Sequence, residues 1–338
     1  MKIAYLLYPG AVVSNKSNGI RSQAKTWADE LKARGHRVDL MNEWVSFDDW
    51  ETYDIIHLFG PDQNKWMQSV SSSIASMNAN IVYSPIIDPE KDRRPLRECL
   101  RNLRRKFLAT RGVYSRQYGY CKLVLARSNC EREYLTERFG LLNEKVKVVP
   151  LSYSAIYKNL EIISTAKKPF VFHLSSLAQS RKNVGRLIDA AKKYGFKLVL
   201  AGSTGSDKDR ENLCKKIDNT DNIELLGFIN EEQKLKLYKE AKVFALPSLC
   251  EGVGIVALDA ALFGCEVVIT DIPGPKEYYN GQCFEVNPYD VDSIGRGVMD
   301  ALNNKRYQPE LGNMINSVYS PEAIAIQLEQ AYVYCRGL

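Results

Sequence analysis

Short apolar runs alternate with amphipathic segments along the second half of the chain. The runs 170–174, 197–202 and 242–246 have the length and the apolar, β-branched content of buried strands. The segments between them repeat apolar residues every three or four positions, which is the pattern of helices that bury one face. Strands that alternate with helices are typical of a doubly wound parallel sheet. The pattern therefore predicts an α/β domain over 161–320.

The amino half shows the same alternation less regularly. Apolar residues over 20–31 recur on one helical face, and the run 80–85 has the pattern of a strand. We therefore expect a second α/β domain over 1–160. A linker is expected around 152–169, where periodicity is lost, and the last stretch, 321–338, again has helical spacing.

Composition narrows the class of protein. The chain has 338 residues, 45% of them hydrophobic, which suffices for two cores of ordinary size. No apolar span long enough to cross a membrane and no signal peptide is recognised, so we expect a cytoplasmic protein. The eight cysteines form no CxxC pair, and only three histidines are present. This predicts free thiols, no metal site and no cofactor.

Two acids flank a glycine-bearing turn that opens a predicted helix. Glu251 lies in the loop after the strand 242–246, and Asp259 lies on the helix that begins near Gly254. A helix amino end offers unpaired N–H groups and partial positive charge, and glycines let a ligand approach the backbone. A diphosphate is therefore expected on the amides of Val253, Gly254 and Ile255, with Gly252 beside them.

The two acids then suit the two ends of a nucleotide sugar. Asp259 lies roughly 7–8 Å along the helix axis from the phosphate position, where a carboxylate could bind the two hydroxyls of a ribose. Glu251 lies on the other side and could bind the hydroxyls of an attached sugar. The same residues also fit an ordinary strand, turn and helix with a surface Glu and an Asp whose hydrogen bonds are satisfied within the chain.

The segment LPSLCEGVGIVALDAAL resembles the nucleotide-sugar signature of the family 4 glycosyltransferases, in which PS-x-x-E-G-x-G precedes a second acid. The resemblance implies a retaining enzyme with the GT-B fold, in which two Rossmann-like doubly wound parallel-sheet α/β domains face each other across a cleft. It implies that Glu251 contacts the donor sugar and that Asp259, one methylene shorter than the family's Glu, binds the ribose. It also implies that the helix over 321–338 crosses back to the amino domain.

An upstream stretch, SSLAQSRKN, resembles the family's Arg-Leu-x-x-x-Lys-Asn motif. Lys182 takes the position of the family's Lys, and Ser176 stands where the family has Arg. Arg181 could supply the missing guanidinium from one turn away. Both a Lys ammonium, which acts as a point charge, and an Arg guanidinium, whose N–H groups form a fork, can neutralise a diphosphate. The resemblance thus implies a catalytic set of Glu251, Lys182 and Arg181.

Other donor-binding residues follow from the same resemblance. The stretch NIELLGF places Gly227 and Phe228 by the base or phosphate, at the carboxyl ends of the strands. Gly202 ends the strand before them. Gly19 lies in a loop that resembles the family's amino-terminal glycine loop and faces the donor, although it equally fits a plain helix start.

The acceptor side departs from the family. A His usually follows the strand that corresponds to 80–85, and this chain has Ser84-Pro85-Ile86-Ile87-Asp88 instead. We expect Asp88 or Ser84 to contribute to the acceptor pocket, or the catalytic arrangement to be altered. His57 could reach the cleft or could be packed inside.

A basic segment stands out against the modest net charge of +6. Residues 91–116 contain ten Lys or Arg and two acids, and Arg97, Arg101 and Arg104 lie beside an apolar stripe. A basic amphipathic helix suits an anionic membrane surface or a lipid-linked sugar diphosphate. A solvated helix face is the alternative. No aromatic or RNA-binding motif accompanies the charge, so we expect no nucleic-acid partner.

These observations and the resemblance together predict a metal-independent glycosyltransferase (EC 2.4), and the resemblance implies that it retains the configuration of the transferred sugar. It would move a sugar from a nucleotide-diphosphate-sugar to a hydroxyl of a sugar or lipid-linked acceptor, in polysaccharide or glycolipid biosynthesis. It would be cytoplasmic, and peripheral on the inner face of the membrane if 91–116 binds lipid. Two alternatives remain: a non-catalytic, nucleotide-binding family member that supports a partner transferase, and a nucleotide-sugar epimerase on the same fold.

Overall fold

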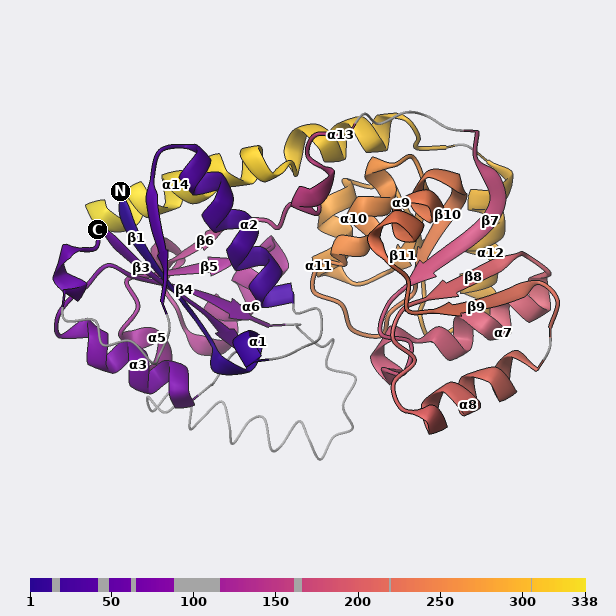
Figure 1. The fold of residues 1–338 in the computed structure, drawn as a ribbon, viewed down its shortest axis with the longest axis horizontal. Helices are drawn as coiled ribbons and strands as arrows, with labels where there is room; N and C mark the ends of the chain where they lie inside the picture. Colours follow the sequence, from indigo (N-terminus) through magenta and orange to yellow (C-terminus); the bar gives the residue numbers. More distant parts are fainter. Residues whose placement is uncertain are drawn as a thin grey trace. The chain divides into compact units, whose positions relative to one another are not determined.

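The computed structural model describes residues 1–13, 19–41, 49–61, 65–87, 116–160, 166–218, 220–304 and 306–338. The chain divides into two units (Figure 1). Unit 1 comprises Met1–Leu151 and Pro321–Leu338, and unit 2 comprises Ser152–Ser320. The carboxyl-terminal segment therefore belongs to the amino-terminal unit, and the chain passes between the units after Leu151 and after Ser320. The first of these crossings, after Leu151, comes earlier in the chain than residue 160, which the sequence predicted as the domain boundary.

Unit 1 is built on a six-stranded sheet whose order is β2-β1-β3-β4-β5-β6 and whose neighbouring strands are all parallel. The central strands are buried on both faces, which explains their continuous apolar character. The strands are β1 (Lys2–Leu7), β2 (Arg37–Leu40), β3 (Ile55–Pro61), β4 (Ile81–Ile86), β5 (Leu123–Ala126) and β6 (Val146–Val148).

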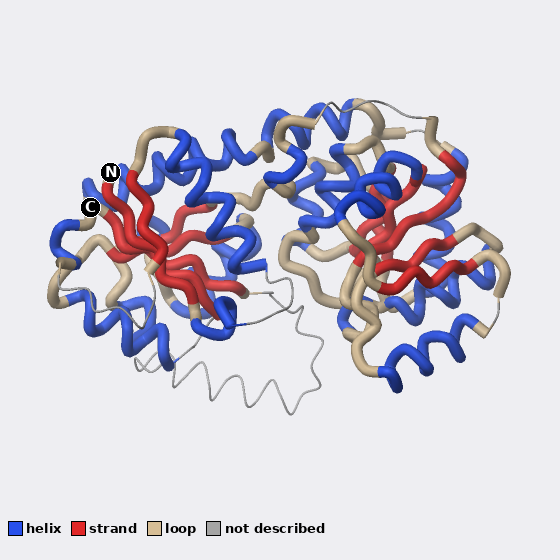
Figure 2. The backbone as a smooth tube through the Cα atoms, in the orientation of Figure 1, coloured by secondary structure: helices blue, strands red, loops and turns tan. Residues whose placement is uncertain are grey.

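Helices cover the sheet of unit 1 (Figure 2). The longest of those that precede β6 buries Ala24, Trp27 and Leu31, the apolar face expected from the sequence. Ser128 caps the helix that follows β5, because its hydroxyl accepts from the Glu131 N–H. The helices are α1 (Pro9–Val13), α2 (Gly19–Ala33), α3 (Lys65–Ala75), α5 (Arg116–Gly119), α6 (Asn129–Phe139) and α14 (Pro321–Gly337).

A buried polar chain fastens α14 to the sheet of unit 1. The Tyr332 hydroxyl lies 2.8 Å from that of Tyr5 and 2.6 Å from His57 Nδ1, and His57 Nε2 lies 2.8 Å from Ser84 Oγ. His57 is fully buried and stacks on Phe59, and burial holds its pKa well below the usual 6.5. His57 is therefore a packed, hydrogen-bonded residue, which is one of the two roles expected for it.

Unit 2 is built on a second parallel six-stranded sheet, in the order β12-β11-β10-β7-β8-β9. The chain proceeds from β7 outward to β9 and then returns to place β10 on the other side of β7. The sheet therefore has its topological switch point between β7 and β10. The strands are β7 (Lys168–Leu174), β8 (Leu198–Ala201), β9 (Ile223–Gly227), β10 (Ala241–Leu246), β11 (Glu266–Thr270) and β12 (Phe284–Val286).

Helices cover both faces of this sheet as well (Figure 2). Local sequence starts two of them, since Ser206 with Asp209 and Asn230 with Gln233 form reciprocal capping boxes. The helices are α7 (Val184–Tyr194), α8 (Asp207–Ile217), α9 (Glu231–Glu240), α10 (Ile255–Leu262), α11 (Pro273–Lys276), α12 (Val291–Asn303) and α13 (Glu310–Val318). Two doubly wound α/β units with separate cores confirm the predicted fold class.

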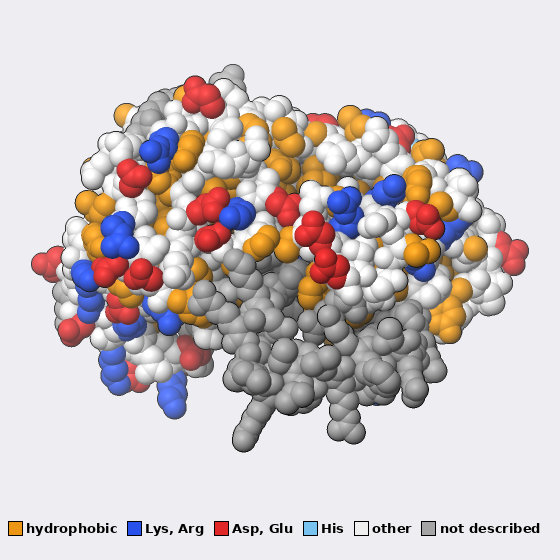
Figure 3. Space-filling model, turned by 180° about the vertical axis from the view of Figure 1, so that it is seen from behind, with side chains coloured by type: hydrophobic (Ala, Val, Ile, Leu, Met, Phe, Trp, Pro, Cys, Tyr) orange, Lys and Arg blue, Asp and Glu red, His pale blue; other side chains and the backbone are white. Residues whose placement is uncertain are grey.

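The surface of the described residues carries both signs of charge. On the face drawn in Figure 3, acidic and basic side chains are interspersed. Within the described ranges, no helix combines the length and apolar character needed to span a bilayer. The basic segment 91–116 lies outside the described residues except for Arg116, so the predicted membrane contact through Arg97, Arg101 and Arg104 stays a prediction.

Candidate functional site

The carboxyl ends of β7, β8 and β9 are joined by backbone contacts. The Ser175 N–H donates to the Ala201 carbonyl (3.2 Å), and the Gly202 N–H donates to the Gly227 carbonyl (2.7 Å). Gly202 has φ +122°, and a Cβ there would lie 1.8 Å from the Ser175 carbonyl oxygen. Only glycine allows this close approach. Gly202 therefore shapes the sheet edge where the donor was expected.

Lys182 and Glu251 form an ion pair beside the switch point. The Lys182 Nζ lies 2.5 Å from Glu251 Oε2, and the two side chains are only 12% and 10% exposed. The Ser248 hydroxyl donates to the same carboxylate oxygen at 3.2 Å. Lys182 comes from the loop after β7 and Glu251 from the loop after β10, so the two motifs found in the sequence meet in space.

Further contacts hold the two loops together. The Leu249 N–H donates to the Arg181 carbonyl at 2.7 Å, and an Arg181 guanidinium N–H reaches the Cys250 carbonyl at 3.5 Å. Asn183, in the left-handed conformation at φ 60°, donates from its amide to the carbonyls of Pro247 and Pro288. The loop that carries both cations is thus bound to the loops after β10 and β12.

The amino end of α10 follows Glu251 directly. Gly254 precedes the helix with φ +77°, and a Cβ there would lie 2.9 Å from the Leu246 side chain. The first N–H groups of a helix have no intrahelical acceptor. Gly252, Val253 and Gly254 are buried, and Ile255 is half-buried. The amides expected to hold a diphosphate therefore directly follow Glu251, the ionic partner of Lys182.

Asp259 has a partner that the sequence did not indicate. Its side chain is 1% exposed, and its carboxylate accepts from the Ser154 N–H (2.8 Å) and the Ser154 hydroxyl (2.7 Å). Burial raises the pKa of Asp259 to about 6, opposed by the two bonds from Ser154. The carboxylate is therefore satisfied within the chain, as the alternative interpretation expected, and direct ribose binding by Asp259 stays a prediction.

His173, near the carboxyl end of β7, is a residue that sequence reasoning missed. Its Nδ1–H donates to the Ala245 carbonyl at 2.7 Å, so its Nε2 accepts from the Ser175 hydroxyl at 2.7 Å. Burial lowers the pKa of His173 to about 4, with the charge of Lys182 contributing. A neutral imidazole thus ties β7 to β10 and orients the residue next to Ser176. The buried position within an apolar strand pattern was its only sequence signal.

The buried His173 predicts a pH dependence of folding stability. Its folded pKa lies below the ordinary 6.5, so its contribution is complete above pH 6.5 and is lost as pH falls towards 4. The expected loss is about 3 kcal/mol. Urea unfolding of wild type and His173→Asn, which can keep the bond to the Ala245 carbonyl, measures the effect. The wild-type free energy of unfolding should fall more steeply with acidification, and equal slopes would refute the assignment.

The remaining predicted donor residues have different environments. Phe228 is 86% exposed just beyond β9, and a Cβ on Gly227, at φ +69°, would meet no atom within 4 Å. Ser176 is half-buried and lies in the loop that also contains Lys182. Gly19 is exposed at the start of α2. Because Gly19 belongs to unit 1, its expected contact with a donor stays a prediction.

Asp88, predicted for the acceptor pocket, lies outside the described residues. Ser84, the alternative to it, is described: it is buried and bonded to His57. In the described part of the chain, no three His, Cys, Asp or Glu side chains gather in the manner of a metal site. Metal independence remains an expectation from the sequence.

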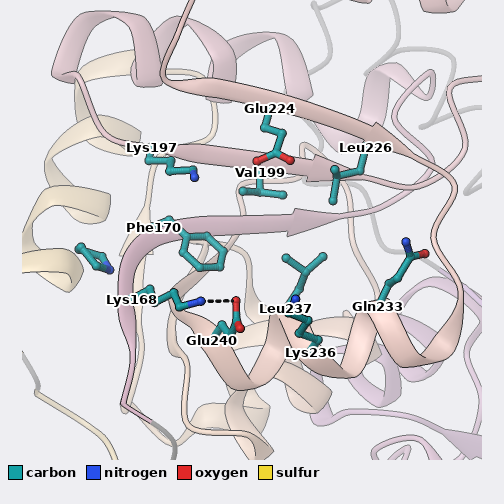
Figure 4. A pocket seen from close by; sticks show the side chains of 11 residues that line it. Lys168, Phe170, Lys197, Val199, Glu224, Leu226, Gln233, Lys236, Leu237 and Glu240 are labelled. Atoms are coloured by element: carbon teal, nitrogen blue, oxygen red, sulfur yellow. Dashed lines mark ion pairs between the residues drawn. The ribbon is translucent and has the colours of Figure 1, made fainter.

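A separate groove of about 530 Å³ lies on the face of β7, β8 and β9 beside α9 (Figure 4). Phe170 and Val199 contribute its apolar lining, and Lys168 pairs with Glu240 at 2.9 Å. None of the predicted site residues lines this groove. The predicted donor site at the strand ends is therefore separate from this groove.

Comparison with known proteins shows that this chain is similar to glycosyltransferases. Residues 158–318 match the model of the family described as Glycosyl transferases group 1. An uncharacterized glycosyltransferase, MJ1607, of Methanocaldococcus jannaschii is 34% identical over 139 residues, which are 39% of this chain and 36% of that protein. The O-antigen chain mannosyltransferase B of Escherichia coli is 23% identical over 55% of this chain and 53% of that protein. The chain thus matches about half or less of the length of these relatives.

Solved structures share the whole fold. A glycosyltransferase from Rickettsia africae superposes with a TM-score of 0.75 at 15% identity, covering 99% of this chain and 98% of that one. Anabaena HepE in complex with UDP superposes with a TM-score of 0.69 at 17% identity, covering 98% and 99%. These likenesses confirm the GT-B fold class. Residues 158–318, just under half of the chain, are similar to the Glycosyl transferases group 1 family.

Proposed function

We propose that this protein is a retaining glycosyltransferase that moves a sugar from a nucleotide-diphosphate-sugar to an acceptor hydroxyl in glycan biosynthesis. One observation carries the proposal. The Lys182 ammonium group lies 2.5 Å from Glu251 at the amino end of α10, beside the switch point of the sheet. Open α/β sheets bind ligands at this location, and helix amino ends bind phosphate.

The comparisons support a sugar-transfer activity and a nucleotide sugar as donor. Two relatives are named as O-antigen chain mannosyltransferases. One fold neighbour was solved in complexes with UDP and with UDP-glucose. The family match falls on unit 2, so unit 2 is proposed to bind the donor and unit 1 to bind a sugar or lipid-linked acceptor.

In the proposed reaction, the bond between sugar C1 and the diphosphate oxygen breaks, and its electron pair leaves with the diphosphate. The acceptor oxygen bonds to C1 from the same face, and its proton passes to the leaving phosphate oxygen. Lys182, Arg181 and the amides around Gly254 would stabilise the developing negative charge. Glu251 would hold the sugar hydroxyls and, before binding, keeps Lys182 in place.

This charge arrangement predicts activity without a divalent cation. Lys182 and the helix amides would supply the charge stabilisation that a bound metal supplies in other enzymes. Extensive dialysis against EDTA should therefore leave the rate of nucleoside diphosphate release unchanged. A loss of activity that Mg²⁺ or Mn²⁺ restores would contradict this part of the proposal.

The proposal is tested by a thermal-shift screen with UDP, GDP, ADP, TDP and their common sugar conjugates, followed by donor hydrolysis on any hit. Stabilisation by one nucleotide family, with slow hydrolysis that Glu251→Ala abolishes, would support the transferase. Binding without turnover would favour the non-catalytic alternative. The Asp259 carboxylate, which already accepts two hydrogen bonds from Ser154, is the observation that favours that alternative. Conversion of the donor sugar without an acceptor would favour the epimerase, and no stabilisation at all would refute the site.

Phe228 is expected to stack on the nucleobase, because an 86% exposed aromatic ring beside the open space at Gly227 offers a flat apolar surface. Stacking of one base contributes about 1–3 kcal/mol. Phe228→Ala should therefore weaken nucleoside diphosphate binding by about 5- to 150-fold, measured by titration calorimetry. Phe228→Tyr should keep the affinity, and pyrophosphate should bind wild type and both variants alike. An equal loss for pyrophosphate would exclude stacking.

A further inference from the structure

Ser154 belongs to none of the motifs, yet it holds the carboxylate of Asp259. The Ser154 N–H donates to Asp259 Oδ1 at 2.8 Å, and the Ser154 hydroxyl donates to Oδ2 at 2.7 Å. Asp259 is 1% exposed, whereas Ser154 is half-buried. Ser154 is therefore the more accessible residue of the pair.

This arrangement gives the Ser154 hydroxyl a defined polarity. Because its proton points to Asp259, the lone pairs of Ser154 Oγ are left to accept hydrogen bonds. A charged acceptor behind a hydroxyl strengthens the next bond in the chain. Asp259 is one methylene shorter than a glutamate, and the serine hydroxyl extends its carboxylate by one hydrogen bond of 2.7 Å. The pair can thus present an acceptor farther out than Asp259 alone.

Ser154 is also held firmly from its amino side. The Tyr153 N–H donates to the Tyr319 carbonyl at 3.1 Å, and the Tyr153 hydroxyl donates to Asn316 Oδ1 at 3.1 Å. Tyr278 stacks on Tyr319 with ring centroids 4.8 Å apart. All of these residues belong to unit 2. The hydroxyl is therefore fixed before any ligand arrives, which lowers the entropic cost of binding.

We propose that Ser154 is a specificity-determining residue whose hydroxyl, oriented by Asp259, accepts a hydrogen bond from a ribose hydroxyl of the donor nucleotide. The inference rests on the proposed function, since α10 carries both Asp259 and the expected diphosphate site at its amino end. It assigns the ribose contact to a serine after the passage from unit 1 to unit 2, with Asp259 as the positioning residue behind it.

Titration calorimetry with UDP, GDP and ADP, and with the 2′-deoxy and 3′-deoxy forms of whichever binds, tests the proposal on the full chain. Wild type should bind the ribonucleotide about 10-fold or more tightly than at least one deoxy form, because a missing donor leaves a polar group unpaired. Ser154→Ala should bring this ratio close to one. Ser154→Thr, which keeps a hydroxyl, should preserve it, and thermal unfolding verifies that both variants are folded.

The outcomes separate this inference from the proposed function. Failure of wild type to bind any of the four nucleoside diphosphates of the thermal-shift screen would refute the proposed function and the inference together. Binding without discrimination between ribose and its deoxy forms would refute the inference alone. Full discrimination in folded Ser154→Ala would likewise overturn it and assign the contact to another group. If Ser154→Ala does not fold, loss of discrimination in folded Asp259→Asn supports the pair, and retained discrimination overturns it.

Discussion

Replacing Lys182 with alanine is expected to reduce sugar transfer by about 100- to 1000-fold, the usual effect of removing one group that stabilises developing charge in a closed site. The Lys182 ammonium group lies 2.5 Å from the Glu251 carboxylate, which comes shortly before the amino end of α10. Its loss removes positive charge from the leaving diphosphate and leaves Glu251, 10% exposed, without its ionic partner. Steady-state release of nucleoside diphosphate from the preferred donor measures the effect.

The chain offers a matched control for this variant. Lys168 pairs with Glu240 at 2.9 Å in the same unit, but at the opposite end of β7 and with its side chain 60% exposed. Lys168→Ala should leave transfer unchanged, because a surface ion pair contributes little. Lys182→Arg should retain part of the activity, since the charge stays. Turnover by folded Lys182→Ala at the wild-type rate would remove Lys182 from the mechanism.

Replacing Gly202 with alanine is expected to have the largest effect on stability, a loss of about 4 kcal/mol or more. The added Cβ would lie 1.8 Å from the Ser175 carbonyl oxygen, and φ is +122°. The clash is with backbone, so it cannot be relieved by a side-chain rotation. Relief of the clash would separate the ends of β7 and β8, and this movement would also displace the hydrogen bond from Gly202 to Gly227. Urea unfolding measures the loss.

Gly227→Ala provides the comparison. Gly227 also has a positive φ, +69°, but a Cβ there would meet nothing within 4 Å. The expected cost is only that of the left-handed conformation, about 1–2 kcal/mol. Equal losses of stability in the two variants would show that conformation, and not contact with Ser175, explains the effect.

The sequence predicted the parts of the site that depend on local pattern. The strands and helices of unit 2 follow from periodicity, and the loops after β7 and β10 meet because adjacent parallel strands end at the same edge of a sheet. The meeting of Lys182 with Glu251 was therefore foreseeable. The partner of Asp259 was not, because Ser154 lies 105 residues away in a stretch without periodicity.

Two other features had no readable signal. His173 and Ala245 lie 72 residues apart in the sequence and are hydrogen-bonded between two strands. A histidine within an apolar run does not reveal its hydrogen-bond acceptor. The division between the units follows from long-range packing, and the stretch after Leu151 belongs to unit 2 through bonds such as that of Tyr153 to Tyr319. Side-chain contacts between distant segments leave no trace in local periodicity.

The most direct measurement of the central claim is an amide NMR titration of ¹⁵N-labelled protein with UDP, GDP and ADP. If unit 2 binds a diphosphate at the amino end of α10, one nucleotide should shift the amide signals of Val253, Gly254 and Ile255 most strongly, and Lys182→Ala should weaken that binding. Shifts that instead cluster around the groove lined by Phe170 and Val199, or the absence of any shift near Gly254, would contradict the account.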